Sequence, residues 1–154
     1  MGRRDHILLY PVHEKPNVLA NSRFDTLGAG GADVFANWGE IADGTSTISA
    51  DDTVKRTGPY ACKLHFPDGN NVYVWQQIGT VGQRYKVSLW VKTASAGLFI
   101  YVAHGTAVQA LTTNTTDWQK FVFFLTCATN NVFKIARNGA AGTAWIDDVL
   151  VQKA

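Results

Sequence analysis

The sequence has little cysteine, proline or charge, and it contains no long hydrophobic run. Its 154 residues include two cysteines, four prolines and 17% charged residues, with a formal net charge of +2. A charge this small and scattered does not provide the basic face that nucleic-acid binding requires. No apolar stretch approaches the roughly 18 residues of a membrane span. We therefore expect neither a nucleic-acid partner nor a membrane partner.

The two cysteines argue against a disulfide framework, and the N-terminal residues argue against a secretory signal. Cys62 and Cys127 fall within predicted strands, and two cysteines make no disulfide framework. We expect two buried thiols rather than a disulfide. The first residues have a basic start but an apolar stretch too short for a secretory signal. The chain is then expected either to work without such export or to be part of a longer protein.

Motifs that carry catalysis are also missing. The adjacent carboxylates Asp51-Asp52 and Asp147-Asp148 are expected to point to opposite faces of a strand, where they cannot act as an acid/base pair. The four histidines have no metal-ligand spacing, and the sequence contains neither a Gly-x-Ser-x-Gly motif nor a phosphate-binding loop. We expect a protein that is not an enzyme.

The sequence does contain many short alternating segments. It has five Trp, five Tyr, eight Phe and 14 glycines, which suits strands joined by tight turns. The predicted strands are Val18–Asn21, Trp38–Ala42, Thr45–Ser49, Tyr60–Phe66, Val72–Ile78, Tyr85–Thr93, Leu98–His104, Val108–Thr112, Trp118–Ala128, Val132–Arg137 and Ala144–Val151. Residues 27–33 are predicted to form a glycine-rich loop. The spacing predicts an all-β, antiparallel β-sandwich of the jelly-roll type.

The chain divides into an arm and a domain. Residues 1–16 carry several apolar side chains but are closed off by Pro11 and Pro16, which is typical of an extended segment that docks on another surface. Residues 17–154 form the predicted sandwich domain.

Alternation assigns faces to the strongest strands. In Tyr85–Thr93, the apolar residues Tyr85, Val87, Leu89 and Val91 share the predicted core face, which sends Trp90 outward. In Val72–Ile78, the second face carries Tyr73, Trp75 and Gln77. We predict one exposed aromatic face that contains both Trp75 and Trp90.

Several segments together resemble the jelly-roll carbohydrate-binding modules of the galactose-binding-like folds, a family that also occurs in phage structural proteins. They cover about residues 17–152 in the family's order: Val18–Asn21 with Arg23–Asp25, Asn37-Trp38, Thr57–Leu64, Trp75–Ile78, Gly82–Lys92, Thr116–Phe121 and Ile146–Val149. The resemblance implies the sandwich fold. It does not specify a sugar, because fold does not fix function.

The resemblance also implies a structural Ca²⁺ where the first and last strands meet. Ca²⁺ binds six to eight oxygens from carboxylates and carbonyls. By position, the metal-binding residues would be Asn21, Asp25 and Asp147. The alternative is that Arg23 neutralises Asp25 or Asp147 through a salt bridge.

For a ligand, the resemblance and the aromatic faces together suggest glycan binding. Sugar rings stack on aromatic side chains while polar groups fix the hydroxyls. The candidate ligand-binding residues are Tyr73, Trp75, Gln77, Trp90, Lys92, Phe99, Tyr101 and Arg137. The same aromatic side chains could instead pack as a second layer or face another protein subunit.

Two settings suit such a protein. The favoured one is a non-catalytic structural protein of a virion surface, such as a capsid decoration or tail component, that contacts other subunits through residues 1–16 and the aromatic face. The alternative is an extracellular glycan-binding module of a secreted glycoside hydrolase.

Overall fold

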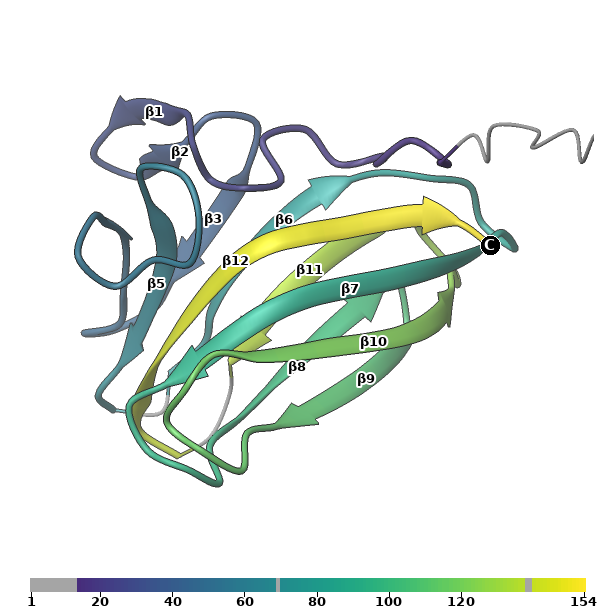
Figure 1. Cartoon of the computed structure of the whole chain (residues 1–154). Helices are drawn as coiled ribbons and strands as arrows, with labels where there is room; N and C mark the ends of the chain where they lie inside the picture. The colour runs from purple at the N-terminus through teal and green to yellow at the C-terminus, as the bar shows by residue number, and fades with distance from the viewer. Residues whose placement is uncertain (1–13, 69, 138–139) are drawn as a thin grey trace, which may run out of the picture.

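A computed structural model describes residues 14–68, 70–137 and 140–154, and these residues form an all-β sandwich of two antiparallel sheets (Figure 1). The expected jelly-roll fold is confirmed. The first sheet has the strand order β10 (Gln119–Thr126), β7 (Arg84–Thr93), β12 (Gly142–Lys153), β5 (Ala61–Phe66) and β4 (Thr47–Asp51). The second has the order β3 (Gly39–Ala42), β6 (Val72–Gln77), β11 (Val132–Arg137), β8 (Phe99–His104) and β9 (Ala107–Thr112).

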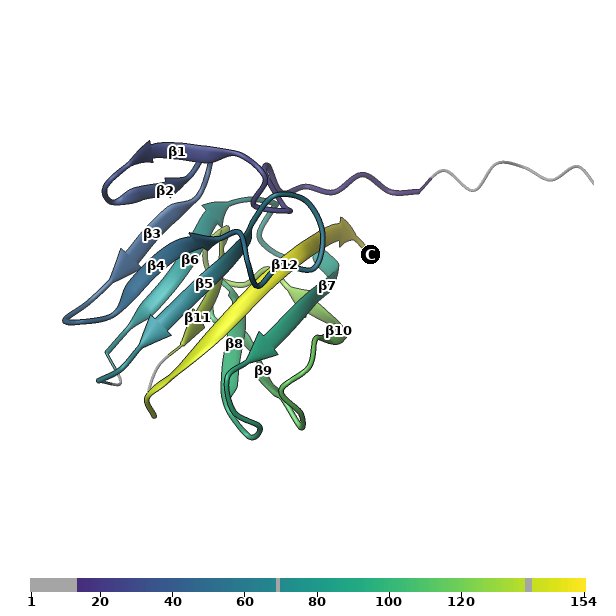
Figure 2. The ribbon, with the colours of Figure 1, turned by 60° about the vertical axis from the view of Figure 1, so that its left-hand side comes forward.

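The predicted glycine-rich loop at residues 27–33 is wrong. These residues belong to a hairpin of β1 (Leu27–Gly30) and β2 (Asp33–Phe35), which lies at one end of the sandwich (Figure 2). The hairpin reverses through Gly30 and Gly31, whose φ angles are 91° and 64°. Glycine adopts this left-handed region without the steric cost of a Cβ, so the glycines that suggested a loop are what permit a tight turn.

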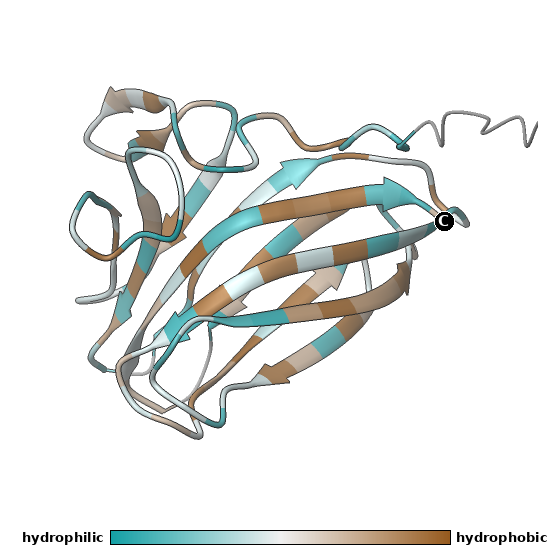
Figure 3. Ribbon diagram, viewed as in Figure 1, coloured by the Kyte–Doolittle hydropathy of each residue, from teal (hydrophilic) through white to brown (hydrophobic). Residues whose placement is uncertain are grey.

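Alternation along the strands creates the core. Tyr85, Val87, Leu89 and Val91 of β7 are fully buried between the sheets, and Figure 3 shows the apolar bands that alternate with polar ones along this strand. The opposite sheet contributes the buried residues of β6, β8 and β11, which include Val72, Val74, Ile100, Val102, Phe133 and Ile135. Removal of this apolar surface from water is the main stabilising contribution.

The predicted strand Val18–Asn21 is also wrong, although the segment lies where a strand would be expected. Beyond residue 146, β5 no longer pairs with β12, and residues 17–22 cover the exposed edge. The N–H of Val18 donates to the carbonyl of Val151 at 2.8 Å. The Asn17 side chain donates to the carbonyl of Val149 at 3.0 Å and accepts from the N–H of Val151 at 2.9 Å. The Asn17 side chain thus supplements the backbone hydrogen bonds of Val18 and Ser22 at this edge.

The expectations for the cysteines and the N-terminal arm have different outcomes. Cys62 and Cys127 are free, buried thiols, as predicted. The expectation that residues 1–16 form a docking arm falls mostly on residues 1–13, which lie outside the described part of the chain. In the ranges that are described, no helix is long and apolar enough to span a membrane.

Candidate functional site

The outward surface of the second sheet carries most of the predicted aromatic residues. Tyr73 and Trp75 project from β6, and Phe99 and Tyr101 project from β8. Tyr73 and Tyr101 lie in one row across the sheet, on either side of Ala136 of β11. We call the outward side chains of Ile41, Tyr73, Trp75, Gln77, Phe99, Tyr101 and Lys134 the aromatic face.

Local sequence determines how Trp75 lies on this face. Trp75 is paired with Gly39 of the edge strand β3. A Cβ placed on Gly39 would lie 2.2 Å from the indole ring, so the ring rests against the bare backbone of β3. Only glycine leaves room for this approach. The indole is thereby held in place and remains half-exposed at the surface.

Two shallow depressions flank the indole. One, of about 310 Å³, is lined by Ile41, Tyr73, Trp75, Gln77, Val132 and Lys134. The other, of about 430 Å³, is lined by Ala20, Asn37, Trp38, Gly39, Trp75, Gln76 and Gln77. Trp75 and Gln77 line both, so they form a ridge between two hollows. This shape suits an extended ligand whose rings contact the aromatic side chains.

Lys134 occupies the middle of the aromatic face. It pairs with Trp75 in the sheet, and its Nζ atom lies 5.2 Å from the Tyr73 ring centroid and 5.5 Å from that of Tyr101. Both distances are within the range of cation–π attraction. The ammonium group is therefore held over the gap between the two tyrosines.

Trp90 does not belong to this face, so the single aromatic face predicted for Trp75 and Trp90 is wrong. Trp90 and Lys92 project from β7 in the first sheet, whose outer surface is on the opposite side of the sandwich. Alternation assigned both indoles correctly to outward positions. It could not assign them to sheets, because sheet membership depends on pairing between distant strands.

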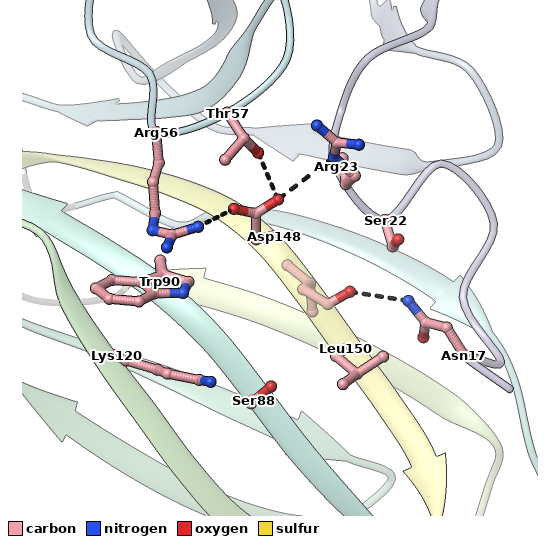
Figure 4. A pocket seen from close by; sticks show the side chains of 11 residues that line it. Asn17, Ser22, Arg23, Arg56, Thr57, Ser88, Trp90, Lys120, Asp148 and Leu150 are labelled. Atoms are coloured by element: carbon pink, nitrogen blue, oxygen red, sulfur yellow. Dashed lines mark hydrogen bonds and ion pairs between the residues drawn. The ribbon is translucent and has the colours of Figure 1, made fainter. Parts of the chain in front are cut away.

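The surroundings of Trp90 form a polar groove of about 610 Å³ (Figure 4). The Arg56 guanidinium lies over the indole, with its carbon 3.8 Å from the ring centroid. Lys92 donates to the carbonyl of Thr116. Because Arg56 already covers one face of the ring, Trp90 offers a sugar less stacking surface than Trp75 does.

Arg56 also takes part in a cluster of charged groups at the edge of this groove. It pairs with Asp148 at 2.5 Å, and Arg23 lies 3.4 Å from the same carboxylate. The Thr57 hydroxyl donates to Asp148 at 2.6 Å. Arg23 also lies 3.6 Å from Asp25. The expected ion pair of Arg23 therefore forms with Asp25, and additionally with Asp148 rather than Asp147.

Asp147 is fully buried beside this cluster. Its carboxylate accepts the N–H groups of Arg56 at 2.9 Å, Thr57 at 3.0 Å and Asp148 at 2.8 Å. Burial raises the pKa of Asp147, and the bonds from Thr57, Arg56 and Asp148 oppose that rise. The carboxylate thus holds the Arg56-Thr57 turn onto β12.

The expectation that Asp147 and Asp148 point to opposite faces is wrong. The pairing register of β12 shifts between Asp147 and Leu150, and Asp148 has a φ of 49°. Such a bulge breaks strict alternation, and both carboxylates reach the Arg56-Thr57 turn. Asp148 pairs with Arg23 and Arg56, and Asp147 accepts backbone N–H groups. These contacts give both carboxylates a structural role.

The expected calcium ligands do not fit the ion in this arrangement. Both oxygens of Asp147 accept backbone N–H groups, and the Asn21 side-chain oxygen accepts the N–H of Thr26 at 3.1 Å. Asp25 Oδ1 is buried without a hydrogen-bond partner among the described residues, but Arg23 supplies positive charge beside it. Among those residues, no group of three or more His, Cys, Asp or Glu side chains could hold a metal.

Arg137 is the remaining predicted site residue, and it does not lie at the surface. It is 1% exposed, with its guanidinium carbon 4.5 Å from the Phe99 ring and 5.2 Å from the Phe66 ring. Burial lowers the pKa of Arg137. Its strand position faces the core, which alternation along Val132–Arg137 could have shown. The same alternation could have identified Lys134, which sequence reasoning missed.

The fold of this chain is similar to that of solved structures. No family model matches the chain, and no curated protein matches it. Among solved structures, TmCBM61 in complex with β-1,4-galactotriose has a TM-score of 0.61 and 17% identity, over 90% of this chain and 99% of that one. The fold is that of a carbohydrate-binding module.

Two further solved structures to which this chain is similar belong to longer chains. The CBM22-1 and GH10 modules of endo-1,4-β-D-xylanase 10B from Clostridium thermocellum, solved with xylohexaose, have a TM-score of 0.63 and 13% identity over 91% of this chain. The enzymatically active domain of tailspike protein 4 from bacteriophage CBA120 has a TM-score of 0.63 and 11% identity over 90% of this chain. This chain spans 29% and 21% of those two chains, respectively.

Proposed function

We propose that this protein is a non-catalytic module that binds a glycan on the aromatic face. The observation that supports this most directly is the ridge of Trp75 between two hollows, with Tyr73 and Tyr101 in a row across the same sheet. Aromatic rings supply apolar stacking surface at a small cost in conformational entropy. The carbohydrate-binding-module fold supports the same proposal.

The experiment compares the two indoles of the opposite outer surfaces. Wild-type protein, Trp75→Ala and Trp90→Ala are tested on a glycan array and by affinity electrophoresis in polysaccharide gels. Trp75→Ala should weaken binding, since aromatic stacking contributes about 0.5–1.5 kcal/mol beyond the area that the ring buries, or roughly 2- to 12-fold in affinity, and the lost buried area adds to this. Trp90→Ala should bind as wild type. The reverse pattern would place the site in the Trp90 groove.

For the biological setting, we propose a virion surface, where the module would contact other protein subunits. The similarity to a bacteriophage tailspike domain over 90% of the chain supports this setting. The alternative, an extracellular module of a secreted glycoside hydrolase, is supported by the similarity to xylanase modules. Quantitative mass spectrometry of gradient-purified particles and of particle-free supernatant separates the two, because the protein should be enriched in only one fraction.

A further inference from the structure

Among the described residues, the aromatic face carries positive charge but no negative charge. Lys134 is the only charged residue, of those that the structure describes, that lines either of the two depressions beside Trp75. Neither depression is lined by an aspartate or a glutamate among the described residues. The carboxylate of Glu40 on β3 accepts the N–H groups of Val34 and Phe35, both at 2.8 Å. It is therefore bonded to the β1–β2 hairpin.

The ammonium group of Lys134 has no anionic partner in the described part of the chain. The ion pairs found there involve Arg23, Arg56 and Lys63, whereas Lys134 contacts only the rings of Tyr73 and Tyr101 through cation–π geometry. These contacts fix the position of the charge without neutralising it. The aromatic face therefore presents a positioned cation between stacking rings.

This arrangement selects between classes of glycan. A neutral sugar presents hydroxyl groups that need acceptors as well as donors. The Gln76 amide is already bonded to the backbone of Ala20, so the side-chain acceptors that the described residues offer here are Asn37, Gln77 and the tyrosine hydroxyls. A carboxylate or sulfate needs donors only, and its hydrogen bonds to an ammonium group are about twice as strong as neutral ones. Of the described residues that line the depression with Lys134, none is a carboxylate that would repel such a group.

We propose, on the basis of the proposed glycan-binding function, that the ligand is an acidic polysaccharide whose carboxylate or sulfate group pairs with Lys134. The sugar rings then contact Trp75, Tyr73 and Tyr101. The affinity for such a ligand decreases as salt screens the ammonium group. The affinity for a neutral glycan on the same rings does not.

The test uses matched polymers that differ in charge. Polygalacturonate and alginate are each compared with their carboxyl-reduced forms, and dextran sulfate is compared with dextran, by isothermal titration calorimetry at low and high NaCl. The acidic polymer of at least one pair should bind at least tenfold more tightly than its neutral form. The two polyuronates and dextran sulfate distinguish carboxylate from sulfate as the recognised group.

The matched variants are Lys134→Gln and Lys86→Gln. Lys86 is exposed on β7, on the opposite outer surface, so it controls for general attraction to a polyanion. Lys134→Gln should weaken binding of the acidic polymer by about tenfold or more, the effect of one hydrogen bond to a charged group. Lys134→Arg should retain binding, and the melting temperatures should show that all variants fold.

The outcomes separate this inference from the proposed function. Equal binding of acidic and neutral forms, unchanged in Lys134→Gln, would overturn the inference while the glycan function stands. Equal losses in Lys134→Gln and Lys86→Gln would reduce the attraction to non-specific charge and also overturn it. If no polymer or arrayed glycan binds, the proposed function itself fails.

Discussion

Substitution of Asp147 by alanine should destabilise the protein strongly, although no ligand or metal is involved. Asp147 is fully buried, and its carboxylate accepts three backbone N–H groups from Arg56, Thr57 and Asp148. A hydrogen bond to a charged acceptor contributes about 1.5–3 kcal/mol. The cost of burying the carboxylate, seen in its raised pKa, offsets part of this sum. We expect a net loss of about 3–5 kcal/mol, as for other broken buried charge networks.

The assay is urea denaturation at neutral pH, with Asp52→Ala as the matched control. Asp52 is an exposed aspartate that accepts only the Thr53 hydroxyl among the described residues, so its removal should change the free energy of unfolding by less than about 0.5 kcal/mol. Asp147→Asn should lie between the two variants, because it keeps one acceptor oxygen. A loss below about 1 kcal/mol for Asp147→Ala, at an unchanged denaturant slope, would refute the role assigned to this carboxylate.

The remaining predictions concern acid stability, metal dependence and the second indole. Burial lowers the pKa of His104 below its ordinary 6.5, although the bond to the Ile78 carbonyl opposes this. The unfolded chain then binds the proton more tightly than the folded protein does. The free energy of unfolding should therefore decrease as the pH falls below about 6.5. Urea titrations should show a smaller decrease for His104→Gln. Thermal unfolding curves in millimolar calcium and in chelator should superimpose, because Arg23 already pairs with Asp25 and backbone N–H groups already bind both oxygens of Asp147. A higher melting temperature in calcium would contradict this. Trp90→Ala should cost about 1–2 kcal/mol, less than the 3–5 kcal/mol of a core aromatic residue, and a larger cost in urea denaturation would show that its indole belongs to the core.

Local pattern predicted much of the fold because it reports which way a side chain points. Alternation assigned Tyr73, Trp75 and Trp90 to outward positions and the apolar residues of β7 to the core, as the burial of those residues shows. It could not show that Trp75 and Trp90 lie on opposite surfaces. That result depends on which strands pair across long stretches of sequence, and a period of two contains no such information.

The errors at the charged cluster have a different origin. Strict alternation fails at the β12 bulge, where the left-handed backbone of Asp148 turns two adjacent carboxylates toward the same turn. An Asp-Asp pair in a sequence does not predict a bulge. Likewise, nothing in the sequence around Arg56 indicates that its side chain lies over Trp90 and pairs with Asp148, residues 34 and 92 positions away.

The most direct test of the proposed function is to observe which indole senses a glycan in solution. The five tryptophans give five indole N–H signals in a ¹H–¹⁵N correlation spectrum, each assignable with a single Trp→Phe variant. During titration with the oligosaccharide that binds best on the array, the Trp75 signal should shift and saturate. The signals of Trp90 and of Trp145, which is paired with Lys92 in the first sheet, should stay in place. Saturable shifts at Trp90 with none at Trp75 would contradict the assignment of the glycan site to the aromatic face.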